Sequence, residues 1–197
     1  MTDEKYYKLI QPYEDAMRML LTRLDVLNHN LYAASHTKPV HHIMSRVKGK
    51  ASLENKLIRQ GYEPTIENAK DRLQDIAGVR VICYFVDDIY NLVNTLKMQA
   101  DLICITEKDY ISQPKPNGYR SLHVILGIPV YCMDGMEYFP VEVQFRTLSM
   151  DFWASMEHRI CYKKDPPNKE EISSELLDFA NILVDIEKRF EHYNDSI

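Results

Sequence analysis

The amino-acid sequence predicts an α/β (mixed α+β) fold, in which a mixed sheet of about five strands is flanked by helices, with long helices at both ends of the chain. The helices are indicated by apolar residues that recur at steps of three and four over residues 3–34 and 168–195. The strands are indicated by segments that alternate apolar and polar residues or are rich in β-branched residues. A chain of 197 residues is long enough to bury a core, so we expect one domain covering residues 1–197.

Composition narrows the classes of function. The chain has 29 acidic and 24 basic residues, which gives a net charge of -5, whereas a protein that coats nucleic acids usually carries a basic surplus. The four cysteines form no Cys-x-x-Cys pair, so no zinc or redox motif is indicated. The first residues lack a signal-peptide pattern, and no run of about 18 apolar residues occurs. We therefore expect a cytoplasmic protein without a membrane partner.

The helix predicted over residues 3–34 carries one long apolar stripe. Its interruption is Pro12, which either lies within the first turns or marks a kink. A stripe of this length can cover the core or pair with the same helix of another subunit, and we favour core packing for most of its length. Residues 37–39 then break the helix, and residues 40–48 have the pattern of a short strand.

A cluster of basic residues follows this strand. Ser52 is a candidate N-cap for a helix over residues 53–60, which Gly61 would end. Free N–H groups and the helix dipole favour an anion at such an N-terminus. The basic side chains that we expect to gather there, or to follow on the helix, are Arg46, Lys48, Lys50, Lys56 and Arg59. The residues alone support a phosphate site and a solvated basic face equally.

A buried strand with a charged residue inside it is predicted within residues 75–86. Arg80 lies in the middle of this β-branched run, where a buried guanidinium is costly without an anionic partner. Asp75, near the head of the strand, is either a turn or cap residue or a metal ligand. The neighbouring elements are predicted as a helix over residues 67–74, a helix over residues 87–98 that begins at an Asp cap, and a strand over residues 101–106.

The segment over residues 108–123 gathers two cations, an aromatic ring and a titratable ring, namely Lys108, Lys115, Tyr119 and His123. Asn117 and Gly118 within it indicate a turn. An aromatic residue at a loop-to-strand junction, as Tyr119 is, can stack on a nucleobase. The competing interpretation is a tyrosine that packs on the surface, which is common for any single residue.

The remaining strands are predicted as a hairpin. A strand over residues 121–133 contains Pro129, which predicts an edge strand or a bulge, and Asp134 and Gly135 form the turn. The returning strand alternates strictly, so its two faces differ. One face takes Val141, Val143 and Phe145, and the other takes Glu142, Gln144 and Arg146. A helix over residues 148–164 follows, ended by Pro166 and Pro167.

Six segments stand in an order and at a spacing that belong to one known family. They are Arg46-x-Lys48 with Ser52 and Lys56, Asp75-Ile-Ala-Gly-Val-Arg80, Lys108-Asp-Tyr-Ile, Lys115-Pro-Asn-Gly-Tyr119-Arg-Ser-Leu-His123, Val-Glu142-Val-Gln144-Phe-Arg146-Thr and Phe-Trp153-Ala-Ser-Met-Glu157-His158. The set resembles the synthetase domain of the RelA/SpoT family, and the chain looks like its single-domain branch, the small alarmone synthetases. The resemblance implies a nucleotidyltransferase-like fold with a catalytic core over residues 40–165. It also implies synthesis without hydrolysis, because the His-Asp pair of the family's hydrolase domain does not occur.

The resemblance further implies a GTP diphosphokinase of the stringent response, which moves the pyrophosphate of ATP onto the ribose 3′-hydroxyl of GDP or GTP. Asp75 and Glu142 are the candidate catalytic residues and Mg²⁺ ligands if their strands are neighbours, and Glu142 is alternatively the general base. The candidate ATP-binding residues are Arg46, Lys48, Ser52, Lys56, Arg59 and Arg80. The candidate guanine-nucleotide residues are Lys108, Lys115, Asn117, Tyr119, His123 and Gln144.

Partners and rival functions complete the expectations. The family implies a homotetramer, with a product nucleotide or an RNA as candidate regulator. One rival is a toxin-like relative that pyrophosphorylates tRNA or an adenine nucleotide, although a tRNA substrate should need a broad basic surface, which the net charge of -5 opposes. The other rival is a nucleotide- or RNA-binding regulator that has lost catalysis, which would be expected to lack Asp75 or Glu142.

Overall fold

The computed structural model describes residues 1–161, 169–194 and 196. Within them lies one sheet of five strands in the order β1-β2-β5-β4-β3. The strands are β1 (Val40–Val47), β2 (Ala77–Cys83), β3 (Ile103–Asp109), β4 (Leu122–Cys132) and β5 (Gly135–Thr147). Strands β2 and β5 pair in parallel, and the other neighbours are antiparallel. The predicted mixed sheet is therefore confirmed.

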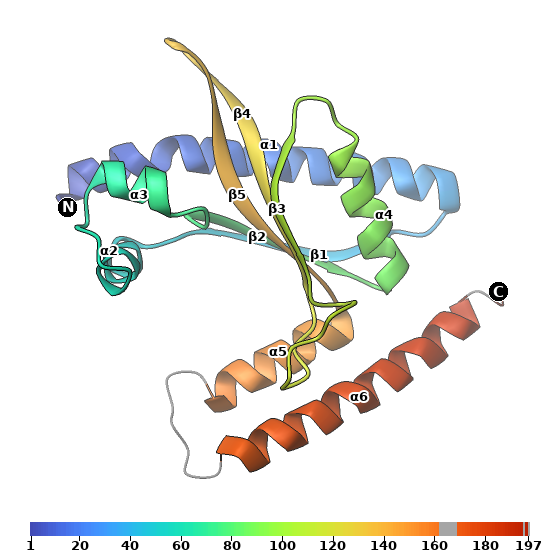
Figure 1. The fold of residues 1–197 in the computed structure, drawn as a ribbon. Helices are drawn as coiled ribbons and strands as arrows, with labels where there is room; N and C mark the ends of the chain where they lie inside the picture. Colours follow the sequence, from blue (N-terminus) through green and yellow to red (C-terminus); the bar gives the residue numbers. More distant parts are fainter. Residues whose placement is uncertain (162–168, 195, 197) are drawn as a thin grey trace.

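Helices flank this sheet, and Figure 1 shows the longest of them crossing β4 and β5. They are α1 (Asp3–Ser35), α2 (Lys50–Arg59), α3 (Ile66–Arg72), α4 (Val86–Lys97), α5 (Leu148–Cys161) and α6 (Lys169–Asn194). The long terminal helices predicted from the sequence are α1 and α6. Parts of four predictions lie outside the described residues: residues 162–165 of the core, the end of helix 148–164, its Pro166–Pro167 stop, and both ends of helix 168–195. Among the described helices, none is long and apolar enough to span a membrane.

The apolar face of the sheet packs against α1 and α4 and forms the core. Val141, Val143 and Phe145 of β5 are each 0% exposed, and they belong to one cluster with the buried residues of both helices. Removing such side chains from water stabilises the fold by about 1.5–3 kcal/mol each. The stripe of α1 therefore packs mainly on the core, and Pro12 lies inside the helix near its start. The opposite, polar face of β5 remains open for a site.

Two predicted helix starts were wrong. Helix α2 begins at Lys50 with Gly49 as its N-cap, because neither Lys50 nor Ala51 disfavours a helix, so Ser52 lies in the first turn. Helix α4 begins at Val86 after Phe85, and the predicted Asp cap lies inside the helix. The Asp88 carboxylate still caps the start of α4, because it accepts a hydrogen bond of 3.0 Å from the Phe85 N–H.

The prediction for the strand that contains Pro129 was wrong for the strand as a whole. Strand β4 lies between β5 and β3, and its register with β5 runs without a shift from Leu122 to Cys132. Strand β3 pairs with β4 only as far as Gly127. Beyond that point none of the described strands lies on that side of β4, so the missing N–H of Pro129 interrupts no ladder there.

Helices α5 and α6 pack on each other in a second, smaller cluster below the sheet. Trp153 and Ala154 of α5 are buried with Leu176 and Ala180 of α6, and the Trp153 indole N–H donates to the Leu176 carbonyl at 2.7 Å. Gly118, in the loop between β3 and β4, packs closely against α6. Its φ is +89°, and a Cβ there would lie 2.6 Å from the Ala180 Cβ. Only glycine fits this position without strain.

Candidate active site

The strand register aligns the polar side chains of the sheet in two adjacent rows. In the first row Arg46 of β1 lies opposite Gly78 of β2, which lies opposite Glu142 of β5. The second row crosses all five strands through Met44, Arg80, Gln144, His123 and Lys108. Opposed residues in neighbouring strands project from the same face. Residues from five separate segments therefore meet on the open face of the sheet.

A cavity of about 700 Å³ opens beside the first row. Its charged and polar lining comes from β1 and the residue after it, from α2, from the segment just before β2, and from β5. These residues are Arg46, Lys48, Ser52, Asn55, Lys56, Arg59, Asp75 and Glu142. Five of the six predicted ATP-binding residues are in this lining. The sixth, Arg80, lines an adjoining hollow of about 190 Å³ that shares Arg46, Gly78 and Glu142 with the first. Gly78 contributes no side chain to the floor between them.

Lys50 does not join this cluster, which corrects an expectation from the sequence. Its ammonium group lies 2.6 Å from the Asp3 carboxylate of α1, because the earlier start of α2 turns it toward the N-terminal helix. Arg59, in contrast, remains exposed on the last turn of α2, where its guanidinium contacts the Asn55 carbonyl at 3.4 Å. The cationic wall of the cavity therefore consists of Arg46, Lys48, Lys56 and Arg59.

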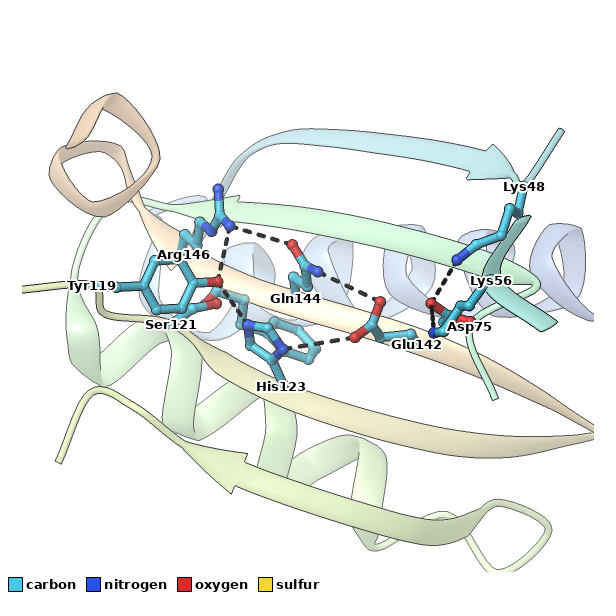
Figure 2. A network of polar contacts seen from close by, with 10 residues as sticks. Lys48, Lys56, Asp75, Tyr119, Ser121, His123, Glu142, Gln144 and Arg146 are labelled. Atoms are coloured by element: carbon cyan, nitrogen blue, oxygen red, sulfur yellow. Dashed lines mark hydrogen bonds and ion pairs between the residues drawn. The ribbon is translucent and has the colours of Figure 1, made fainter. Parts of the chain in front are cut away.

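Asp75 lies at the centre of the cationic wall. Its Oδ2 accepts hydrogen bonds of 2.6 Å from both Lys48 and Lys56 (Figure 2). Burial alone would raise the pKa of the Asp75 carboxyl, but the two lysines outweigh burial and hold the pKa below its ordinary value. Its other oxygen, Oδ1, is buried and has no hydrogen-bond partner in the described part of the chain. A buried carboxylate oxygen without a donor is suited to a cation.

Glu142 is the second carboxylate of the site. Its Oε1 lies 3.7 Å from His123 Nδ1, and its Oε2 accepts a contact of 3.5 Å from the Gln144 amide. The contact with the His123 ring lowers the pKa of Glu142 and outweighs the opposing effect of burial. The negative charge of Asp75 acts on the same pKa in the raising direction, so the two carboxylates are close enough to interact. This donor set fits Mg²⁺, which usually takes one or two carboxylates and completes its shell with substrate phosphates.

Figure 2 shows that Glu142 belongs to a closed ring of five side chains. The ring runs from Glu142 to His123, from His123 Nε2 to the Tyr119 hydroxyl at 2.8 Å, from Tyr119 to Arg146 at 3.0 Å, from Arg146 to Gln144 at 3.3 Å, and back to Glu142. Arg146 has only donors, so the Gln144 oxygen must face it and the amide nitrogen must face Glu142. The ring therefore fixes the orientation of each member.

The predicted guanine-nucleotide residues gather around Tyr119. The Lys115 ammonium lies 4.8 Å from the ring centroids of both Tyr119 and Tyr110, and Lys108 is opposite His123 on β3. The Asn117 side-chain oxygen accepts from the Tyr119 N–H at 3.2 Å, so Asn117 shapes the turn. Edge-to-face contacts with Trp153 and His123 hold the Tyr119 ring from two further sides.

Sequence reasoning did not identify the role of two charged residues that support this arrangement. Arg146 was placed on the polar face of its strand, but it is only 5% exposed. Its partner is Asp151 in the first turn of α5, whose Oδ1 accepts from Arg146 at 2.9 Å and from Arg80 at 3.3 Å. Burial and the nearby Arg146 charge lower the pKa of Arg80. The available signal for Asp151 was its position in the first turn of α5. This signal is not specific, because the helix dipole favours acidic residues in the first turn of any helix.

The whole arrangement has counterparts among known proteins. Residues 45–167 match the family model described as a region found in RelA/SpoT proteins. Two similar proteins from Bacillus subtilis (strain 168) are the GTP pyrophosphokinase YwaC, 45% identical over 86% of this chain and 81% of that protein, and the GTP pyrophosphokinase YjbM, 34% identical over 83% and 76%.

Solved structures agree with these similarities. Small alarmone synthetase 1 from Bacillus subtilis bound to its product pppGpp superposes with a TM-score of 0.85 at 29% identity, covering 99% of each chain. Small alarmone synthetase 2 from the same organism gives a TM-score of 0.83 at 39% identity, covering 95% of this chain and 98% of that one. Synthetase 1 bound to AMPCPP gives a TM-score of 0.77 at 26% identity. Because the family model covers more than half of the chain and the match to YwaC extends over most of both proteins, this chain belongs to the RelA/SpoT family.

Proposed function

We propose that this protein is a (p)ppGpp synthetase, a GTP diphosphokinase that transfers the pyrophosphate of ATP to the ribose 3′-hydroxyl of GDP or GTP and has no hydrolase activity. The observation that carries the proposal is the position of two ionised carboxylates, Asp75 and Glu142, between a cationic cavity and the aromatic ring of Tyr119. Two proteins that are similar over most of this chain are named GTP pyrophosphokinases. The synthetase domain is assigned to residues 1–197.

The donor nucleotide occupies the cationic cavity in this proposal. Arg46, Lys48, Lys56 and Arg59 surround the phosphates of ATP, with Ser52 at the start of α2, where free N–H groups favour an anion. Arg80 approaches the same nucleotide from the adjoining hollow, whose lining also includes Arg46 and Glu142. Fixed positive groups of this kind offset the charge that develops on transferring phosphoryl groups.

Asp75 and Glu142 would hold Mg²⁺, which when bound neutralises phosphate charge during transfer. The buried, unpartnered Oδ1 of Asp75 and the side chain of Glu142 are the groups available for it. The lowered pKa of each carboxyl keeps both groups ionised at neutral pH. An ionised Glu142 is equally required if it takes the proton from the 3′-hydroxyl.

The acceptor nucleotide is placed on the other side of Glu142. The Tyr119 ring stacks on guanine, and Lys115 and Lys108 face the acceptor phosphates. His123 and Gln144, which both contact Glu142 in the ring of five side chains, orient the ribose. The 3′-oxygen then attacks the β-phosphorus of ATP. The bond between that phosphorus and the oxygen that bridges the α- and β-phosphates breaks, and AMP departs with this oxygen.

Assembly, regulation and location extend the proposal. A homotetramer is supported by apolar side chains exposed on α5 and α6, with Phe152 at 57%, Phe179 at 52% and Phe190 at 65% exposure. Regulation by a product nucleotide or an RNA is proposed on the family resemblance alone. A cytoplasmic location is proposed from the composition of the chain.

The test is incubation of the purified protein with Mg²⁺ and γ-labelled ATP together with GMP, GDP, GTP or deacylated tRNA, each in a separate reaction. We expect label on a guanine nucleotide, and the preferred acceptor is the one labelled fastest. Label on tRNA alone, or on no acceptor, would contradict the proposal. Glu142→Gln keeps the side-chain shape and removes the charge, so it should abolish transfer. Glu137→Gln is the matched control, because Glu137 lies on the same strand and is 62% exposed.

A further inference from the structure

Asp151 stands where the two halves of the proposed site meet. A single oxygen, Oδ1, accepts from Arg146 at 2.9 Å and from Arg80 at 3.3 Å. The side chain of Asp151 is 20% exposed, and that of Arg146 is 7% exposed. The first turn of α5 favours a carboxylate at this position through the helix dipole. Two guanidinium groups from two strands therefore share one counter-ion.

Arg146 depends on this counter-ion because it is buried. A guanidinium removed from water needs a paired anion, and Asp151 is the acid that the structure gives to it. The same guanidinium donates to the Tyr119 hydroxyl and to the Gln144 oxygen, and it lies 5.4 Å from the centroid of the Tyr119 ring. Asp151 thus positions the aromatic ring that receives the acceptor nucleotide, through Arg146.

Arg80 is held less firmly by the same oxygen. Its side chain is 35% exposed, its bond to Asp151 is the longer of the two, and its Nε has no partner within the described chain. It lines the hollow that continues from the cationic cavity. An anionic or stacking donor nucleotide there competes with Asp151 for the donors of Arg80.

We propose that Asp151 couples the two nucleotide sites: a donor nucleotide draws Arg80 away from Asp151, the full carboxylate charge then pairs with Arg146, and Tyr119 is held in place for the guanine nucleotide. The inference rests on the proposed function. Linkage makes the effect reciprocal, so the acceptor strengthens donor binding by the same factor. Couplings of this kind commonly amount to about 5- to 150-fold in affinity.

The test measures the dissociation constant of GDP by calorimetry with and without α,β-methylene ATP, whose carbon bridge blocks transfer. In the unaltered protein the analogue should tighten GDP binding at least about fivefold. In Asp151→Asn, which keeps the shape and removes the charge, the analogue should change GDP affinity by less than about twofold. Asp178→Asn, the same change at an exposed position on α6, should keep the full coupling.

A second variant gives an effect of opposite sign. Arg80→Met keeps the apolar stem and removes the donors, so Asp151 should pair fully with Arg146 even without a donor nucleotide. GDP should then bind as tightly without the analogue as the unaltered protein binds it with the analogue. Emission from Trp153, the single tryptophan, whose ring centroid lies 6.2 Å from that of Tyr119, reports whether GDP reaches this site.

The outcomes separate the two proposals. A protein that binds no guanine nucleotide overturns the proposed function and the coupling together. Binding with the same coupling factor in the unaltered protein and in Asp151→Asn overturns the coupling alone. So does an unaltered protein in which the analogue leaves GDP affinity unchanged.

Discussion

Tyr119 is the residue on which the acceptor side depends. Stacking of a base on an aromatic side chain contributes about 1–3 kcal/mol, which corresponds to a factor of roughly 5 to 150 in affinity. Tyr119→Ala should therefore raise the KM for the guanine nucleotide by that factor and change the KM for ATP much less. Tyr119→Phe keeps the ring and its contact with the Arg146 guanidinium but loses the hydroxyl contacts with His123 and Arg146, so it should raise the KM for the guanine nucleotide less than Tyr119→Ala does. Equal effects of Tyr119→Ala on both substrates would show that the stacking role is wrong.

Gly78 acts through the side chain that it lacks. It lies between Arg46 and Glu142 in the first row, and a Cβ there would meet only the backbone oxygens of those two residues, each at 3.9 Å. Gly78→Val should therefore fold, since valine suits a strand, and should crowd the floor of the cavity. The added methyl groups would occupy space that the bound ATP needs. Overpacking of this kind costs about 1–3 kcal/mol, so the KM for ATP should rise roughly 5- to 150-fold. Steady-state kinetics and the melting temperature measure this, and an unchanged KM with an unchanged melting temperature would contradict the assignment of the cavity.

At the scale of single residues the sequence predicts chemistry better than it predicts partners. The types and order of Asp75, Glu142 and Tyr119 indicated two carboxylates and an aromatic ring near basic residues. The partner of Lys50 could not be predicted, because it depends on where α2 begins relative to α1. Asp151 was equally hidden, since nothing local shows that two strands send guanidinium groups to one acid.

Among the elements, α6 is joined to the end of β5 by a half-buried acid. Glu187 accepts hydrogen bonds from the hydroxyls of Thr147 and Ser149. Burial raises the pKa of Glu187, although these two bonds and the charge of Arg120 oppose the increase. In the folded protein the carboxyl therefore holds its proton more tightly than in the unfolded chain. Its contribution to stability is complete below the unfolded pKa and is lost as the pH rises through the folded pKa.

Glu187→Gln should consequently change stability in a pH-dependent way. Near pH 4 the protonated acid and the amide are alike, so the melting temperatures should be similar. Near pH 8 the variant avoids a partly buried charge and should melt a few degrees higher, since 1 kcal/mol corresponds to about 2–4 °C in a chain of this size. Thermal unfolding of both proteins from pH 4 to pH 8 measures the difference. A variant that melts lower at every pH would show that the charge of Glu187 stabilises the attachment of α6.

The elements themselves were predictable where a period was long or strict. The alternation over Val141–Arg146 gave β5 and both of its faces, and the steps of three and four gave α1. The starts of α2 and α4 were not predictable, because cap geometry decided them against the more usual Ser and Asp caps. The sequence places Phe152, Met156 and Ile160 on one side of α5, but that side is exposed while Trp153 faces α6. Which side a helix buries depends on a neighbour that no local pattern identifies.

For the whole molecule, the exposed apolar side chains of α5 and α6 predict self-association. Light scattering at micromolar concentration should give four times the mass of 23.1 kDa. Replacement of Phe179 and Phe190, which are 52% and 65% exposed, by glutamate puts charges into the proposed contact, where an unpaired charge is costly. The double variant should sediment as a smaller species and keep its fold by circular dichroism. A native protein that is monomeric at these concentrations would contradict the tetramer.

The order of strands was the part of the architecture that the sequence did not determine. The hairpin of β4 and β5 was predictable from its turn residues, although the turn lies at Met133 and Asp134 and Gly135 already pairs with Cys132 as the first residue of β5. The parallel contact of β2 with β5, in contrast, joins distant segments and has no local signal. The prediction that Asp75 and Glu142 hold one cation was therefore conditional on neighbouring strands. The register meets that condition, because Glu142 lies opposite Gly78, just beyond Asp75.

That parallel contact has a consequence for how the protein acquires its activity. Ala77 pairs with Val141, 64 positions later in the chain, and closing so long a loop is slow because its entropy is lost before the contact is gained. The acid that precedes β2 and the acid inside β5 are brought together only in this step. During synthesis, the chain can form α1 and the antiparallel pair of β1 and β2 long before it can form a reaction centre. Recovery of catalysis after dilution from denaturant should therefore coincide with the slowest phase of refolding and lag behind the recovery of helix.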